Sequence, residues 1–304
     1  MKKFRSYVGF VLGVTLLVIV WGAFVRASGS GAGCGEHWPL CNGQVLQRSP
    51  TWSTVIELTH RMTSGLSLLL VVGVVVAACR VFRPGAPARR FAWLTLFFML
   101  TEAAVGAGLV LLRLVADDSS ALRAVVLGVH LVNTLFLLGA MTATALAARA
   151  GPGFLLWRRE DRARAWVLFS LLLVVGVAGA ITALGDTLFP AGTLAAGLAA
   201  DADPLSHFLV RLRVIHPVLA LLTLVFAFFT WLRLEPRNPG AARAGHEFVA
   251  LLGIQTLIGL LNIWLLAPVA MQLVHLLVAD LIWIAAVRWW AARAMDGGSR
   301  AVRA

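Results

Sequence analysis

The sequence predicts an all-α polytopic membrane protein with eight transmembrane helices in two tandem, pseudo-symmetric four-helix bundles. Three observations carry this prediction: the apolar composition, eight long apolar runs, and a weak repeat between the two halves of the chain. Of the 304 residues, 60% are hydrophobic and 13% are charged, and the mean hydropathy is +0.87. Because a soluble domain is only about 45–50% apolar, this composition is typical of an integral membrane protein.

Each apolar run is long enough for one crossing, since a transmembrane helix needs ~20 mostly apolar residues. The first run has a second interpretation as a cleaved signal peptide, because a basic start precedes its apolar stretch. Its loss would leave seven spans, so we expect a retained helix. Spans are expected at about 7–25, 54–80, 91–113, 122–147, 165–185, 207–232, 247–267 and 269–292.

The distribution of the basic residues predicts the orientation of these spans. If the N-terminus is cytoplasmic, most of the 26 Lys and Arg residues fall in cytoplasmic segments, as the positive-inside rule requires. Both termini are therefore expected in the cytoplasm, with the protein in the cell (plasma) membrane. The formal charge of +12 reflects this topology and contact with membrane lipid head groups, and no nucleic-acid partner is expected.

The repeat consists of short resemblances that occur in the same order in both halves. In the fourth span "VHLVNTLFLLGA" (129–140) resembles "VHLLVADLIWIAA" (274–286) in the eighth span. In the third span "EAAVG" (102–106) resembles "QTLIG" (255–259) in the seventh, and the ends of the first and fifth spans, "WGAFVRASGSG" and "AGAITALGD", also match. Self-similarity of this kind indicates two structurally related units.

With four spans in each unit, the repeat is parallel, so both units point the same way across the membrane. We expect an N-terminal four-helix half at 1–148, a cytoplasmic linker at 149–163 and a C-terminal four-helix half with a short tail at 164–304. The linker contains Gly, Pro and a basic run, which are typical of an exposed connection.

Four of the seven histidines lie inside apolar runs, one on each even-numbered span. Each comes roughly 6–9 residues after its span begins, which at about 1.5 Å per residue places it ~9–14 Å below the outer surface. One intramembrane histidine often serves a helix–helix hydrogen bond, but four at one depth favour ligand pairs. Two inward imidazoles suit a haem in an apolar pocket, whereas zinc usually needs three or four protein ligands. We expect one porphyrin site per half, toward the outer leaflet, formed by His60 and His130 and by His216 and His275.

The stretch "IELTHRMTSG" distinguishes the first site from the second. Glu57 lies three residues before His60 on the same helix face, and four residues before Arg61, with which it can pair. Two interpretations stay open: a self-neutralising ion pair, or an acid–base group beside a reacting centre. The second half has Arg213 at the matching position, so we expect one site for chemistry and one for a standing cofactor.

Two further features near the outer surface have open interpretations. The loop "SGSGAGCGEHWPLCNG" belongs only to the first half and can fold over its pocket. In this loop Cys34 and Cys41 form either a static disulfide or a redox pair that works with the site. Near the outer end of the sixth span, Arg211 and Arg213 either bind haem propionates or extend to lipid phosphates.

Four stretches together resemble the haem A synthase family, in its subtype with a cysteine pair in the first outer loop: "SGSGAGCGEHWPLCNG", "ELTHRMTSG", "HLVNTLFLLGA" and "QTLIGLLNIWLLAPVAMQLVHLL". The resemblance covers nearly the whole chain. It implies an oxidoreductase that converts a methyl group of haem O to the formyl group of haem A by successive hydroxylations, through a gem-diol that loses water. By motif it implies these roles: catalytic Glu57, His60 and His130 beside the substrate haem, His216 and His275 as ligands of a resident haem b, and Cys34 and Cys41 as the loop pair.

The resemblance also implies partners, and the sequence departs from the family pattern at two places. The implied partner is haem O synthase, the protohaem farnesyltransferase that makes the substrate. His216 is followed by Pro217 where members of the family often show arginine, and the outer loop at 186–206 contains no cysteine. The alternative functions are a non-catalytic dihaem b-type cytochrome that carries electrons and a haem transporter. The cytochrome does not account for an acid and a cysteine loop in one half only.

Overall fold

The computed structural model describes residues 1–45, 48–150, 159–234 and 238–301. These residues form helices and no β-strand, and eight of the helical segments are long and apolar enough to cross a membrane. The prediction of an all-α polytopic membrane protein is therefore confirmed. The long helices are α1 (Lys2–Ala27), α2 (Trp52–Val81), α3 (Pro87–Leu111), α4 (Ala121–Ala150), α5 (Arg159–Leu188), α8 (Ile215–Arg233), α9 (Pro239–Trp264) and α10 (Val269–Ala301).

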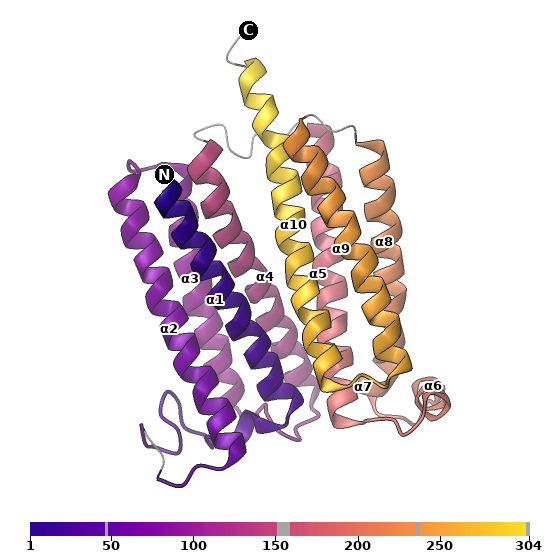
Figure 1. The fold of residues 1–304 in the computed structure, drawn as a ribbon. Coiled ribbons are helices and arrows are strands. Elements are labelled where there is room, and N and C mark those ends of the chain that lie inside the picture. The colour runs from indigo at the N-terminus through magenta and orange to yellow at the C-terminus, as the bar shows by residue number, and fades with distance from the viewer. Residues whose placement is uncertain (46–47, 151–158, 235–237, 302–304) are drawn as a thin grey trace.

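The helices form two groups of four that stand side by side (Figure 1). Helices α1–α4 make up one group, and α5, α8, α9 and α10 make up the other. Because α4 packs against α5 and α10, and α1 also packs against α10, these four helices form the junction. The two groups fit the predicted halves, while the pseudo-symmetry between them stays a prediction. The predicted linker at 149–163 falls mainly on 151–158, which lie outside the described residues.

The two ends of the molecule differ. Both termini lie at one end, called here the terminal end, and the connections after α1 and α5 lie at the opposite end, called here the loop end (Figure 1). Among the described residues, the short helices at the loop end include η1 (Ser30–Ala32), α6 (Leu194–Ala202) and α7 (Phe208–Arg211). An even number of crossings brings both termini to the same end.

The sixth span is not one continuous helix. It consists of α7, a 3₁₀ segment η3 (Leu212–Val214) and α8. Pro217 has no N–H group, and its ring clashes with the carbonyl four residues earlier when that turn is α-helical. The break therefore lies in the turn that precedes Pro217, and one residue, Ile215, separates it from His216.

The apolar core lies mainly toward the terminal end. One buried cluster joins the first half of α1 to the last half of α2, the first half of α3 and the last half of α4. A second cluster joins α4 to the corresponding ends of α5, α8, α9 and α10. Buried side chains are fewer between the helices at the loop end, where a small cluster contains Ala124, Leu184 and Leu209. Tight packing at one end thus leaves room between the helices at the other.

Candidate functional site

A cavity of about 1940 Å³ lies between the helices on the loop-end side of the two cores. Ordinary small-molecule pockets measure about 300–1,000 Å³, so this cavity has room for more than one such ligand. Its wall is mostly apolar and includes residues of both helix groups. All four predicted histidines line it: His60 of α2, His130 of α4, His216 of α8 and His275 of α10.

The two imidazoles of the second group lie at a distance that suits two ligands of one metal. The ring centroids of His216 and His275 lie 6.1 Å apart, with an angle of 83° between the ring planes. Two rings that bind one metal from opposite sides have centroids roughly 6 Å apart, because each metal–nitrogen bond is about 2 Å long. The second pocket therefore fits the predicted pair of axial ligands.

The orientation of His216 leaves one ring nitrogen free for a metal. Its Nδ1 lies 3.1 Å from the carbonyl oxygen of Val175 on α5. Since a carbonyl only accepts hydrogen bonds, Nδ1 carries the proton and Nε2 keeps its lone pair. Ligand histidines commonly use this arrangement to fix their tautomer and ring orientation.

The donor set favours a haem over a bare metal ion. In the part of the chain that the structure describes, no group of three or more His, Cys, Asp or Glu side chains is placed to hold a metal. Each helix group instead offers two imidazoles in an apolar wall. A haem brings the equatorial nitrogens itself and needs the protein only for axial ligands, so these residues fit that group.

Each of the four imidazoles lies against a glycine of an adjacent helix. A Cβ atom added at Gly22 or Gly179 would lie so close to Cε1 of the ring that the histidine would have to move, whereas at Gly259 it would be a tight contact and at Gly106 an ordinary van der Waals contact. The four glycines occupy matching places in the repeat segments "WGAF" and "AGAI", "EAAVG" and "QTLIG", which fits the predicted repeat. The Cβ-to-Cε1 distances are 2.8 Å for Gly22 and His60, 3.9 Å for Gly106 and His130, 2.9 Å for Gly179 and His216, and 3.3 Å for Gly259 and His275.

A carboxylate that the sequence analysis did not single out lies beside the first pair of histidines. Oε1 of Glu102 on α3 is 3.6 Å from Nδ1 of His130 and accepts a hydrogen bond from the hydroxyl of Thr134. The matching residue of the repeat is Gln255, whose side-chain nitrogen donates to the backbone carbonyl of His275 at 3.1 Å. The repeat could have revealed Glu102, because Glu102 and Gln255 are the first residues of the matching segments "EAAVG" and "QTLIG". Each of these segments ends in a glycine that contacts a histidine.

The carboxylate of Glu57 lines the cavity and is already engaged on both oxygens. The residue is 3% exposed. Its Oε2 accepts the backbone N–H of Cys34 at 2.8 Å, and its Oε1 accepts Nη2 of Arg61 at 2.5 Å. Arg61 also donates to the carbonyls of His37 and Leu40 at 2.6 and 2.9 Å. Of the two interpretations, the ion pair is present, and it anchors the loop to α2. The catalytic role of Glu57 stays a prediction.

The glycine-rich loop is also closed on itself by a disulfide. Cys34 and Cys41 are bonded and fully buried, and the hydroxyl of Thr54 donates to the carbonyl of Gly33 at 2.8 Å. Loop residues 38–41 line the cavity. The loop therefore covers the first pocket at the loop end, as the sequence predicts.

Arg213 anchors the loop-end connection of the second group, as Glu57 anchors that of the first. It lies three residues before a cavity histidine, and it holds the connection between α5 and α8. Its Nε is 3.0 Å from Oδ1 of Asp186, and its Nη1 is 3.6 Å from Oδ1 of Asp201. Its Nη2 donates to the carbonyl of Gly185 in the last turn of α5 and to that of Phe189, which directly follows the helix. Burial raises the pKa of the Asp201 carboxyl, and the Arg213 guanidinium opposes this shift.

The other predicted arginine of this region lies apart from the cavity. Nη1 of Arg211 is 3.4 Å from the carbonyl oxygen of Pro204, and Arg211 is not among the residues that line the cavity, whereas Arg213 is. A contact of either side chain with haem propionates stays a prediction.

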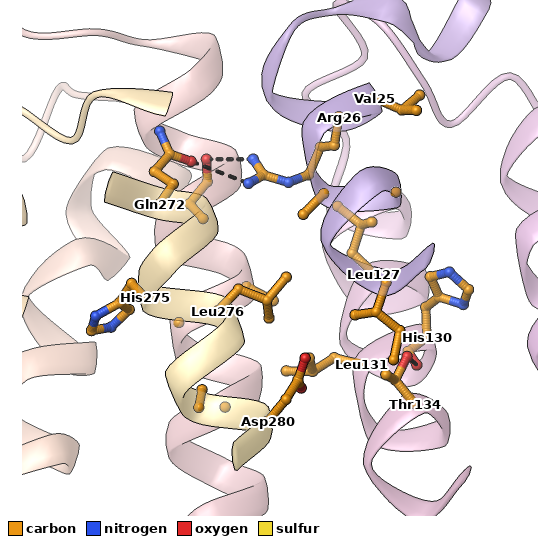
Figure 2. Close-up of a pocket in the computed structure, with 18 of the residues that line it drawn as sticks. Val25, Arg26, Leu127, His130, Leu131, Thr134, Gln272, His275, Leu276 and Asp280 are labelled. Atoms are coloured by element: carbon orange, nitrogen blue, oxygen red, sulfur yellow. Dashed lines mark hydrogen bonds between the residues drawn. The ribbon is translucent and has the colours of Figure 1, made fainter. Parts of the chain in front are cut away.

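Polar side chains also lie between the two helix groups, and Figure 2 shows two of them. Arg26 of α1 extends to Gln272 of α10, and the Nη2 of Arg26 donates to the Oε1 of Gln272 at 3.1 Å. The Nη1 of Arg26 donates to the carbonyl of Ala183 and to the hydroxyl of Thr187 on α5, each at 2.8 Å. Asp280 of α10 lies deeper in the same gap and is fully buried. The sequence around Arg26 and around Asp280 did not indicate that these side chains lie between the two helix groups.

Comparison with known proteins shows the family of this chain. A family model described as "Cytochrome oxidase assembly protein" matches residues 5–287. Two proteins from different strains of Thermus thermophilus, both named "Protoheme IX farnesyltransferase", are 47% identical over 306 residues, 99% of this chain and 50% of theirs. The chain thus spans about half the length of these relatives. "Heme A synthase" of Exiguobacterium sibiricum is 28% identical over 256 residues, 81% of this chain and 80% of that protein.

Proposed function

Because this chain belongs to the family of the cytochrome oxidase assembly protein, we propose that it acts as a haem A synthase, which oxidises a methyl group of haem O to the formyl group of haem A. The relatives named "Heme A synthase" support this proposal. The observation that carries it is one large cavity with a pair of imidazoles from each helix group.

The second pocket is proposed to hold haem b as a resident cofactor. His216 and His275 are its ligands, and the Val175 carbonyl fixes the ring of His216. When bound, the haem supplies a one-electron redox centre whose potential depends on its ligands and on burial. The side chains around this pair offer no carboxylate at the position that Glu57 occupies in the first group, since Arg213 takes that place.

The first pocket is proposed to hold the substrate haem O between His60 and His130. Successive hydroxylations of a methyl group give a gem-diol, which becomes the aldehyde when one hydroxyl leaves as water and the other loses its proton. A carboxylate beside that carbon can move this proton. A carboxylate has about four lone-pair sites, and the contacts with Cys34 and Arg61 use two of those of Glu57. Glu57 can therefore hold the loop and still accept a proton.

The disulfide-closed loop is proposed to keep water away from the first pocket while it is occupied. Its residues form part of the cavity wall, and its backbone is tied to the proposed acid through the Cys34 N–H. Exclusion of water strengthens the electrostatic interactions inside a site. Movement of the loop would therefore change the surroundings of Glu57 directly.

The proposed setting is the plasma membrane, with the terminal end in the cytoplasm and the loop end outside. The concentration of basic residues near the terminal end supports this orientation, and a disulfide in the loop fits an oxidising compartment. The proposed partner is a haem O synthase. Support comes from the two Thermus relatives, which are named for that farnesyl transfer and are about twice as long as this chain.

The proposal is tested by extracting the haems of cells that make haem O, with and without this protein. The wild type is expected to yield the formyl porphyrin, and Glu57→Ala is expected to retain haem b but yield none. Glu36→Ala is the matched control, because Glu36 is an exposed acid of the same loop that pairs with exposed Arg113 at 2.6 Å. If the wild type binds two haems and yields no formyl porphyrin, the electron-carrying alternative holds instead.

A further inference from the structure

Asp280 is a fully buried acid on the wall between the two pockets. It lies on the face of α10 that also carries Gln272 and Leu276 and that is turned toward the first helix group, whereas His275 points to the other side (Figure 2). The side chain is 0% exposed and lines the cavity. Neither of its carboxyl oxygens has a hydrogen-bond partner among the described residues.

An acid in this position is costly to keep as an isolated carboxylate. A buried charge without a partner loses its hydration and gains nothing in exchange, and intramembrane acids commonly mark proton pathways. Several titratable and charged groups line the same cavity. On the helices that pack against α10 they are Arg26 of α1, Arg123 and His130 of α4 and Asp186 of α5, and on the other elements they are Glu57, His60 and Arg61 of α2, Glu102 of α3, Asp201 of α6, Arg213 of η3 and His216 of α8. A lasting charge on a carboxyl group that is fully buried and has no hydrogen-bond partner among the described residues is therefore disfavoured unless a positive charge appears nearby.

The second pocket can supply that change of charge. Asp280 follows the ligand His275 by five residues, about 7.5 Å along the helix axis. A metal bound by the His275 ring lies farther from the carboxyl than this rise, but charges in a medium of low dielectric constant interact over longer distances than in water. The matching position of the first group is Leu135, so only the pocket proposed for the standing cofactor has this acid beside its ligand helix.

We propose that Asp280 exchanges a proton in step with the redox state of the iron held by His216 and His275. With haem bound, its ferric iron would accept one electron from a one-electron donor, and the Asp280 carboxylate would take up one proton from water to become the carboxylic acid. Oxidation reverses both changes, so the net charge of the cavity stays constant. The inference rests on the proposed function only in requiring haem in the second pocket.

The test is a spectroelectrochemical titration of the purified full-length protein with haem b at several pH values. Since low pH favours protonation on reduction, the midpoint potential is expected to fall as pH rises, by up to about 59 mV for each tenfold change in proton concentration. Two variants are expected to remove the dependence of the midpoint potential on pH: Asp280→Asn and Asp280→Leu. The second variant introduces the residue type that Leu135 provides at the matching position of the first group. Asp280→Glu is expected to retain the dependence.

Infrared difference spectra between the reduced and oxidised protein provide a second measurement. The wild type is expected to show the carbonyl band of a carboxylic acid on reduction, and Asp280→Glu is expected to shift that band. A wild-type potential that does not change with pH overturns the inference, as does an equal slope in Asp280→Asn. If the slope depends on Asp280 but cells yield no formyl porphyrin, the inference holds and the proposed synthase activity fails.

Discussion

Replacing Gly179 by alanine is expected to weaken haem binding in the second pocket without weakening the helix that carries it. Gly179 of α5 faces the ring of His216, and an added Cβ would lie 2.9 Å from Cε1 and 3.2 Å from Nδ1. The same Nδ1 makes the 3.1 Å hydrogen bond to Val175 that orients the ring. The new methyl group therefore pushes against both the position and the orientation of the ligand.

The size of the effect follows from these distances. Carbon atoms in favourable contact lie about 3.5–4.0 Å apart, so the ring has to move by roughly 0.5 Å or more. A metal site tolerates deviations of about 0.2 Å in its ligand distances, and disturbed support of a ligand histidine costs about 10–100-fold in metal affinity. We expect a loss of this size, or about 1.4–2.8 kcal/mol. Alanine is meanwhile the better helix former by about 1 kcal/mol.

Haem titration of the purified apoprotein measures the affinity, and thermal unfolding of the same samples measures stability. Gly253→Ala is the matched control, because an added Cβ on this glycine of α9 meets nothing within 4 Å. The expected result is weaker haem binding in Gly179→Ala alone, with unfolding temperatures at least as high as that of the wild type. Equal haem affinity in Gly179→Ala and Gly253→Ala would refute the argument that the glycine positions the ligand.

Two further predictions concern the first pocket. Gly22→Ala places a Cβ 2.8 Å from Cε1 of His60, so extracted haems are expected to retain haem b and lack haem A; an unchanged haem A content would contradict this. Arg61→Gln leaves the buried Glu57 carboxylate without its cation, which typically costs about 3–5 kcal/mol. A clear fall in the unfolding temperature is expected, and Arg113→Gln, which breaks an exposed pair, is expected to have little effect.

The positions of the spans could be predicted because hydrocarbon admits only backbone that satisfies its own hydrogen bonds. Long apolar runs must then be helices, and the structure contains a helix at each of them. The differences lie where the chain becomes polar. Helix α9 begins at Pro239 and not near 247, because Asn238 caps it by accepting the N–H of Ala241 and proline fits the first helical position. This signal lies outside the apolar run, so hydropathy did not reveal it.

The histidines could be predicted because ionisable residues inside an apolar run are rare and expensive. The glycines beside them could not, because a glycine in a span has many roles and only the contact between two helices identifies this one. Only one of the two hydrogen-bond partners of Glu57 could be predicted from the sequence. Spacing along α2 predicted the pair with Arg61, whereas the bond from the Cys34 N–H depends on how the loop folds back.

The residue three positions before the histidine differs between the second and the sixth span. In both groups it ties the loop-end connection to the helix, but with opposite chemistry: Glu57 accepts a backbone N–H, and Arg213 donates to backbone carbonyls. A carboxylate that holds a loop keeps lone pairs with which it can still take up a proton. A guanidinium has no acceptor and does not lose its proton in proteins. The same anchoring task therefore leaves the first pocket able to move protons, while Arg213 contributes no proton transfer to the second.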